Sequence, residues 1–216
     1  LPGSQALARF DARNDAAGIS RSTRRDEEGA AYMADGYARA SGDVGVCLTS
    51  TGPGAVNSLS AMATAYADSS PVLNIFSQIP SAGIERANGY FHDVGDQLGM
   101  FKEVAGWRAR AGNPTEIPWL LNNAFQEMRS RRPRPAAFEV PKDVLDAIAD
   151  AIVPLAAVPT PLVPDQDQIC GAARTILHAK RPVRWAGGGD PQNGRCRPDV
   201  YWAGQPRLGS TGQYGM

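Results

Sequence analysis

Two adjacent carboxylates stand at the start of a segment that is otherwise rich in small residues. Glu27 and Glu28 open the stretch "EEGAAYMADGYARASG", which ends at Gly42. Acidic side chains in the first turn stabilise a helix because they lie beside the positive end of its dipole. The same place also suits a carboxyl group that exchanges a proton with a molecule bound at the helix start. These residues alone leave both interpretations open.

A second group of candidate residues lies in the turn "TSTGPGAVN", residues 49–57. The apolar run from Val44 to Ser50 predicts a strand covered on both faces, and helical periodicity resumes after the turn. Gly52 and Gly54 permit a tight backbone path, so that a ligand can approach the main chain closely. The N–H groups that open the following helix suit the same ligand. An ordinary connection between a strand and a helix has the same composition, so the turn is only a candidate.

Strands and helices alternate as far as about residue 145. Expected strands occupy 44–50, 71–79 and 136–141, and expected helices occupy 27–41, 55–69 and 116–130. This order predicts an α/β fold, a doubly wound and mostly parallel sheet with helices on both faces. Because ligands of such sheets bind at the carboxyl ends of the strands, the loops after Ser50 and Ile79 are the ones to consider.

Each expected helix has an apolar face with the spacing of a helix packed on a core. The predicted buried residues are Ala30, Met33, Ala34, Tyr37 and Ala38 in the first helix, Val56, Leu59, Ala63 and Ala67 in the second, and Ile117, Leu120, Leu121, Ala124, Phe125 and Met128 in the third.

The chain is expected to divide into two α/β units. Residues 1–150 form the first, and a proline-rich extended linker occupies 151–164. Residues 165–189 begin the second unit with a helix and a strand-like run. The segment 190–216 has no sustained periodicity, and we expect it to be disordered or to result from a frameshift.

The composition excludes several classes of protein. Lysine and arginine together number 22, as do aspartate and glutamate, so the net charge of zero favours neither a nucleic-acid partner nor an anionic membrane. The three cysteines have no CxxC spacing, and His92 and His178 lie far apart, which argues against a metal site and fits a reducing compartment.

No apolar run approaches the ~20 residues that span a bilayer. With no signal-peptide pattern at the start, the sequence predicts a cytoplasmic protein. The glycines at 187–189 do not form a dinucleotide fingerprint, because Gln192 stands where it requires glycine.

Several motifs in order along the chain together carry a family resemblance. They are "LPGS", "RRDEEGAAYMADGYARASG", "GVCLTSTGPGAVNSLSAMATAYADSSPVL", "FSQIP", "DQLGMF" and "RPRPAAFEVPKDVL". They resemble the N-terminal, pyrimidine-binding domain of thiamine-diphosphate enzymes of the acetolactate synthase type, and the resemblance extends over about residues 1–189. Since "LPGS" is similar to the junction after the family's first strand, the resemblance implies that this strand and its preceding helix are missing.

The resemblance assigns roles to particular residues. It implies that Glu27 is the catalytic carboxyl group, which contacts the N1′ atom of the cofactor's aminopyrimidine ring and shares a proton with it in a poorly hydrated site. Glu28 is then a capping or surface acid, and Asp26 stands where the family often has histidine. The implied cofactor-binding residues are Gly52, Pro53, Gly54, Asn57 and Gln78, of which Gln78 would face the active-site channel. Phe91 and His92 fall near the substrate channel, although packing roles are equally consistent with both.

The implied function is thiamine-diphosphate-dependent carboligation of 2-oxo acids such as pyruvate, in a homodimer or homotetramer. The family binds the diphosphate through Mg²⁺ in a separate domain with a GDG motif, which this sequence does not contain. FAD is a further cofactor that the resemblance allows. The first alternative is a 2-oxo acid decarboxylase of the same family. The second, of a different class, is a non-catalytic fragment or interaction module, because we expect the isolated chain to be incomplete and inactive.

Overall fold

The computed structural model describes residues 22–156 and 163–181. The described residues fall into two units, one within Leu1–Thr160 and the other within Pro161–Met216. The elements of the first unit are α2 (Glu27–Ser41), β1 (Gly45–Thr49), α3 (Pro53–Asn57), α4 (Leu59–Asp68), β2 (Val72–Gln78), η1 (Ser81–Gly83), η2 (Gly99–Phe101), β3 (Trp107–Arg110), η3 (Pro114–Glu116), α5 (Ile117–Ser130), β4 (Ala136–Pro141) and α6 (Lys142–Asp146). The second unit contains α7 (Gln166–His178).

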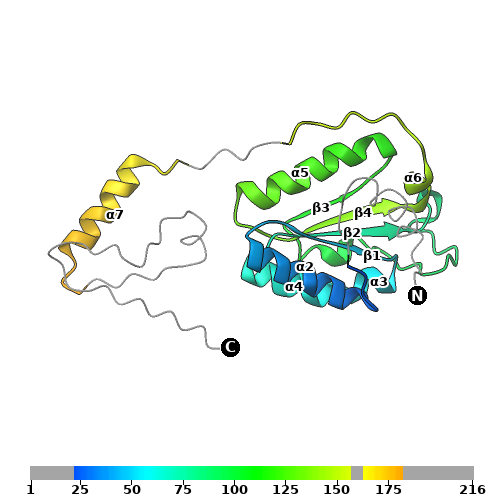
Figure 1. The fold of residues 1–216 in the computed structure, drawn as a ribbon, viewed down its shortest axis with the longest axis horizontal. Helices are drawn as coiled ribbons and strands as arrows, with labels where there is room; N and C mark the ends of the chain where they lie inside the picture. The colour runs from blue at the N-terminus through cyan, green and yellow to red at the C-terminus, as the bar shows by residue number, and fades with distance from the viewer. Residues whose placement is uncertain (1–21, 157–162, 182–216) are drawn as a thin grey trace. The chain divides into compact units, whose positions relative to one another are not determined.

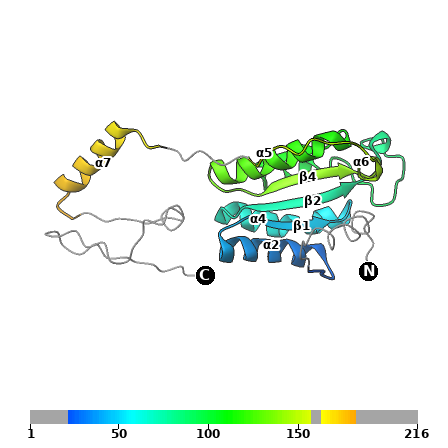
Figure 2. The same ribbon diagram turned by 45° about the horizontal axis from the view of Figure 1, so that its top comes forward.

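The first unit is built on a parallel sheet with the strand order β1-β2-β4-β3 (Figure 1). Gly45 pairs with Val72, Leu73 pairs with Ala136, and Trp107 pairs with Ala136 from the other side. Helices α2 and α4 cover one face of the sheet, and α5 covers the other (Figure 2). The predicted α/β fold with helices on both faces of a parallel sheet is therefore confirmed.

Two apolar cores fill the spaces between the sheet and its helices. The core under α2 and α4 contains the stacked rings of Phe76 and Phe101, whose centroids lie 4.7 Å apart. The core under α5 contains Phe138, with Ala124 and Met128 from the helix. Alternate residues of the central strands enter opposite cores, so that β2 sends Phe76 to one and Leu73 to the other. Packing on both faces holds the sheet in place, and so fixes the positions from which the loops at its carboxyl edge begin.

The predicted buried face of the first helix is partly wrong. Met33 and Tyr37 are 40% and 57% exposed, whereas α2 buries Ala31, Ala34, Asp35 and Ala38. The reason is a close approach between α2 and β1, where a Cβ atom added to Gly45 would lie 1.9 Å from the carbonyl oxygen of Ala34. Only small side chains fit such an interface, so the large ones point outward.

The second predicted helix is two helices, α3 and α4, which meet at Ser58. Its predicted face is partly wrong: Leu59 packs against the core as predicted, but Val56, Ala63 and Ala67 are exposed. The buried residues are Ala55, Ser58, Ala61, Met62 and Ala65. The third predicted helix is confirmed: the six predicted residues of α5 all belong to the core under it.

Two further differences concern the edges of the sheet. β1 is an edge strand, and Val46 is 50% exposed, so the strand is not covered on both faces as predicted. β3 was not predicted from the sequence, because its four residues "WRAR" are too few and too charged to show a strand pattern. The predicted strands β2 and β4 are confirmed, as is the end of α2 at Gly42, whose φ is +74°.

The second unit is described only by α7 and its flanks. The side chain of Asp165 accepts a hydrogen bond from the N–H of Gln168 and caps this helix. In the first unit, residues 147–156 form neither helix nor strand. The expectations for residues 1–21, for the strand-like run near 182–189 and for the segment 190–216 lie outside the described residues. None of the described helices is long and apolar enough to cross a membrane.

Candidate functional site

The candidate site lies where the start of α2 meets the turn after β1. α2 runs antiparallel to the strand that follows it, so its first residue lies at the carboxyl end of β1. Asp26 caps α2, and its side chain accepts a hydrogen bond of 2.6 Å from the N–H of Gly29. This cap relieves Glu27 of a capping role. Glu27 is half-buried, whereas its neighbour Glu28 is exposed.

Three of the predicted site residues are in direct contact. The amide Nδ2 of Asn57 donates a hydrogen bond of 3.4 Å to Oε2 of Glu27. The Cα of Gly54 faces the same carboxylate, because a Cβ atom added there would lie only 2.7 Å from Oε1 of Glu27. Gly54 and Asn57 follow Glu27 by 27 and 30 residues in the sequence, and the fold brings them to it.

Gly52 has the most unusual backbone conformation in the turn between β1 and α3. Its φ of +60° and ψ of −114° belong to a region that side chains rarely permit, and an added Cβ would lie 2.1 Å from the carbonyl oxygen of His92. Pro53 follows as the first residue of α3 and is exposed. Phe91, 84% exposed, stacks on the ring of His92 with centroids 3.8 Å apart. The turn at Gly52 and the segment of Phe91 and His92 are thus neighbours.

A buried polar cluster holds α3 and α4 on the sheet. Asn74 of β2 accepts a hydrogen bond of 3.1 Å from the hydroxyl of Thr49, and its Nδ2 donates one of 2.7 Å to the hydroxyl of Ser58. Ser58 in turn donates to the carbonyl oxygen of Ala55 over 2.6 Å. Cys47 packs against this cluster, and burial raises the pKa of its thiol to about 12, which makes it inert. The cluster fixes the junction of the two helices and so the position of Asn57.

Gln78 does not face an open channel in the described part of the chain. It is 1% exposed, and both ends of its amide are paired within the chain. Its Nε2 donates to Oε1 of Glu139 over 3.1 Å, while its Oε1 accepts from the N–H of Ile79 over 2.8 Å. The structure therefore brings Gln78 into a buried network and not beside Glu27.

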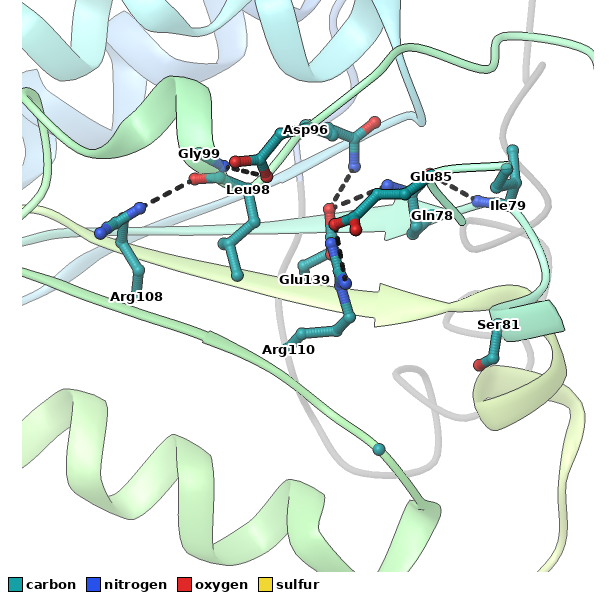
Figure 3. A network of polar contacts seen from close by, with 12 residues as sticks. Gln78, Ile79, Ser81, Glu85, Asp96, Leu98, Gly99, Arg108, Arg110 and Glu139 are labelled. Carbon is teal, nitrogen blue, oxygen red and sulfur yellow. Dashed lines mark hydrogen bonds and ion pairs between the residues drawn. The ribbon is translucent and has the colours of Figure 1, made fainter. Parts of the chain in front are cut away.

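That network has three members that were not predicted, namely Glu139, Gln97 and Arg110. Glu139 is fully buried, and its carboxylate accepts from Gln78, from Gln97 over 2.9 Å and from Arg110 (Figure 3). Burial raises the pKa of Glu139, and the guanidinium of Arg110 opposes this effect. A charged residue inside the apolar run "AAFEVP" was the available signal for Glu139. Gln97 lies in the loop motif "DQLGMF", which contributed to the resemblance but assigned no role to this residue.

Other features of the described residues lie apart from this site. Within residues 22–156 and 163–181, no three His, Cys, Asp or Glu side chains are grouped so that they could hold a metal ion. A cavity of about 410 Å³ lies between the start of α5 and the segment after α6, and it is lined by Thr115, Glu116, Trp119, Leu120, Asp150 and Ile152. It includes none of the predicted site residues.

An α/β domain with a carboxylate, a glycine turn and an amide gathered at the carboxyl edge of its sheet belongs to the class that binds small ligands at that edge. The family described as "Thiamine pyrophosphate enzyme, N-terminal TPP binding domain" matches residues 1–100. A probable acetolactate synthase large subunit of Methanocaldococcus jannaschii is 40% identical over 195 residues, which cover 87% of this chain and 32% of that protein.

Two further relatives extend the comparison. A probable 2-ketoarginine decarboxylase of Pseudomonas aeruginosa is 40% identical over 174 residues, covering 80% of this chain and 31% of that protein. The large subunit of acetolactate synthase isozyme 3 of Escherichia coli is 34% identical over 196 residues, covering 87% of this chain and 33% of that protein. The chain thus spans about a third of the length of these relatives. It carries an N-terminal domain of the thiamine pyrophosphate enzyme family, of the acetolactate synthase-like type.

Proposed function

We propose that residues 1–150 supply the pyrimidine side of a thiamine-diphosphate site, in which Glu27 contacts the N1′ atom of the aminopyrimidine ring. The observation that carries this proposal is the convergence of Glu27, Gly54 and Asn57 at the carboxyl end of β1. The remaining residues of the proposed site are Gly52 and Pro53 in the same turn, with Phe91 and His92 beside it.

The residues present fit a flat, weakly polar ring. Gly54 packs closely against the carboxylate, since a Cβ atom added to it would lie only 2.7 Å from Oε1 of Glu27, so no side chain of the turn comes between its backbone and the acid. Asn57 engages Oε2 and so orients the carboxylate. Half-burial limits the water around the acid without removing its access to a ligand.

Glu27 would act as the group that holds and returns a proton at N1′ of the ring. Such a positioned acid–base group contributes a rate factor of about 10²–10⁴. Thiamine diphosphate, when bound, supplies a thiazolium carbon that acts as a nucleophile toward a 2-oxo acid. Asn57 keeps the carboxylate in place during this exchange, and the glycines of the turn let the ring reach it.

We propose carboligation of 2-oxo acids, with pyruvate as a substrate, as the activity of the complete protein, supported by the similarity to acetolactate synthase subunits. Decarboxylation of a 2-oxo acid is the second candidate, favoured by the equal identity to a probable 2-ketoarginine decarboxylase. A non-catalytic fragment or interaction module is the alternative of a different class, which the test below distinguishes.

The rest of the assembly is part of the same proposal. The diphosphate and Mg²⁺ would be held by the family's diphosphate-binding domain in another subunit of a homodimer or homotetramer. FAD, the further cofactor that the resemblance allows, would bind elsewhere in the complete protein. Residues 151–164 would link the pyrimidine domain to the start of a second domain at 165–189, and the scattered cysteines support a cytoplasmic location.

The experiment follows the exchange of the thiazolium C2 proton of thiamine diphosphate for deuterium by proton NMR, with and without the purified chain. This exchange is the step that the pyrimidine side of the site would promote, and thiamine diphosphate is supplied in large excess because residues 1–150 would hold only its pyrimidine ring. The chain should accelerate exchange above the rate in buffer, and Glu27→Gln should remove most of that acceleration. Glu28→Gln is the matched control. It removes the same charge from the neighbouring residue, whose side chain is exposed. Equal rates for the two variants would refute the role of Glu27, and no acceleration by the unchanged chain would favour the non-catalytic alternative.

A further inference from the structure

The backbone N–H of Gly52 is held by a single side chain that comes from a distant loop. It donates a hydrogen bond to Oε1 of Gln97, which lies 45 residues further along the chain and is fully buried. Glycine readily adopts the backbone conformation found at Gly52, but it is one of several that are open to glycine, so the hydrogen bond helps to select it.

The orientation of the Gln97 amide is determined by its surroundings. Its Nε2 donates to the carbonyl oxygen of Ser77 over 3.0 Å and to Oε1 of Glu139 over 2.9 Å. The carbonyl oxygen of Ser77 and the ionised carboxylate of Glu139 can only accept hydrogen bonds. The NH₂ group of Gln97 must therefore face them, and its carbonyl oxygen must face Gly52. Glu139 therefore decides which end of Gln97 the turn meets.

Glu139 is itself fixed from two sides. Arg110 of β3 forms an ion pair with its other oxygen, and Arg110 also lies 3.9 Å from Glu85 in the loop after η1 (Figure 3). Gln78 of β2 donates to the same oxygen that Gln97 contacts. Among the described residues, the ion pairs of this network join Arg110 to Glu139 and to Glu85. The network connects the carboxyl ends of β2, β3 and β4 to the turn after β1.

We propose that Gln97 is a positioning residue, oriented by Glu139, whose carbonyl oxygen holds the N–H of Gly52 and so fixes the turn that presents Gly54 and Asn57 to Glu27. This inference rests on the proposed function, in which the same turn lines the pyrimidine pocket. Gln97 touches neither Glu27 nor the space over Gly54. It acts through the backbone of Gly52, and the surface loop that contains it is thereby coupled to the site.

Gln78 offers a matched control within the same network. Both glutamines are buried, and each donates from Nε2 to Oε1 of Glu139, but only Gln97 accepts from Gly52. Methionine has nearly the volume of glutamine, so Gln97→Met and Gln78→Met remove the polar ends with little change of packing. The two variants should lose similar amounts of thermal stability.

The test measures amide hydrogen exchange of Gly52 by NMR in the full chain. Gln97→Met should raise the exchange rate of Gly52 about tenfold relative to Gln78→Met, the factor expected for the loss of one hydrogen bond. Equal rates in the two variants would overturn the proposal. The unchanged chain provides a second test, which holds even if Gln97→Met does not fold. If its Gly52 amide exchanges as fast as an unprotected amide, the proposal is overturned.

The deuterium exchange of the thiazolium C2 proton separates this inference from the proposed function. If the turn contributes to cofactor binding, Gln97→Met should lower the rate of that exchange more than Gln78→Met does. A chain that never accelerates the exchange refutes the proposed function, whereas the amide exchange of Gly52 still decides the role of Gln97.

Discussion

Replacement of Gly54 by alanine is the most direct test of how the turn packs against Glu27. The added Cβ would lie 2.7 Å from Oε1 of Glu27 and 2.8 Å from Cβ of Ser50. Both distances are far below the optimum of about 3.5–4.0 Å for such atoms. The carboxylate is the free end of a flexible side chain and can rotate away. Cβ of Ser50 is bonded to the main chain directly after β1, so it can move only if the strand end moves.

The magnitude follows from two opposing terms. Forcing a methyl group into a packed site costs about 1–3 kcal/mol. Alanine gains about 0.5–1 kcal/mol over glycine in a helix, because it restricts the unfolded chain more. The two terms leave a net loss of up to about 2.5 kcal/mol in the free energy of unfolding, centred on about 1 kcal/mol. Gly36 is the control, because it lies within α2 and an added Cβ there meets nothing within 4 Å. Gly36→Ala should therefore stabilise the chain by about 0.5–1 kcal/mol.

Urea unfolding followed by circular dichroism and tryptophan fluorescence would measure both variants. Gly54→Ala should have the lower midpoint, separated from Gly36→Ala by about 2 kcal/mol. In native conditions Gly54→Ala should also slow the thiamine-diphosphate exchange reaction, since the carboxylate has been displaced. If Gly54→Ala proved as stable as Gly36→Ala, the close packing of Gly54 on Glu27 and Ser50 would be wrong.

Three other predictions concern the same domain. Gly52→Ala should destabilise more than Gly54→Ala, because a conformation reserved for glycine adds about 1–3 kcal/mol to an overlap with the rigid carbonyl group of His92; equal urea midpoints would contradict this. Phe76→Ala should cost about 3–5 kcal/mol, because the ring is 1% exposed and stacks on another aromatic ring; a loss below that of Gly54→Ala would show that the core is loosely packed. The pKa of Glu139 is raised by burial above its ordinary value of 4.5. Between these two values the folded chain binds more protons than the unfolded one, so the free energy of unfolding should fall as the pH rises through that window. Arg110→Met should move the upper end of the window to higher pH, which urea midpoints measured from about pH 4 to pH 8 would detect; an unchanged pH profile would mean that Arg110 does not oppose the burial of Glu139.

The local pattern was sufficient for the central elements of the fold. β2 and β4 are short, mostly apolar runs bounded by turn residues, and α5 has a wide apolar face with helical spacing, so the type of each element could be assigned locally. The family motifs also led to Glu27, Gly54 and Asn57, and the resemblance assigned different roles to Glu27 and Glu28. These features depend on neighbouring residues, and the sequence contains that information directly.

The features that the sequence did not reveal depend on contacts between distant segments. The distance between α2 and Gly45 decides whether Tyr37 or Ala31 enters the core. The spacing of apolar residues along the helix gives no information about that distance. β3 exists because β4 offers it a partner, since its own four residues are a weak strand. Gln97 meets Gly52 and Glu139 only because three strands end at one edge of the sheet and a loop crosses them. Hydrogen bonds across 42 to 45 residues have no local periodicity, so only the folded chain reveals them.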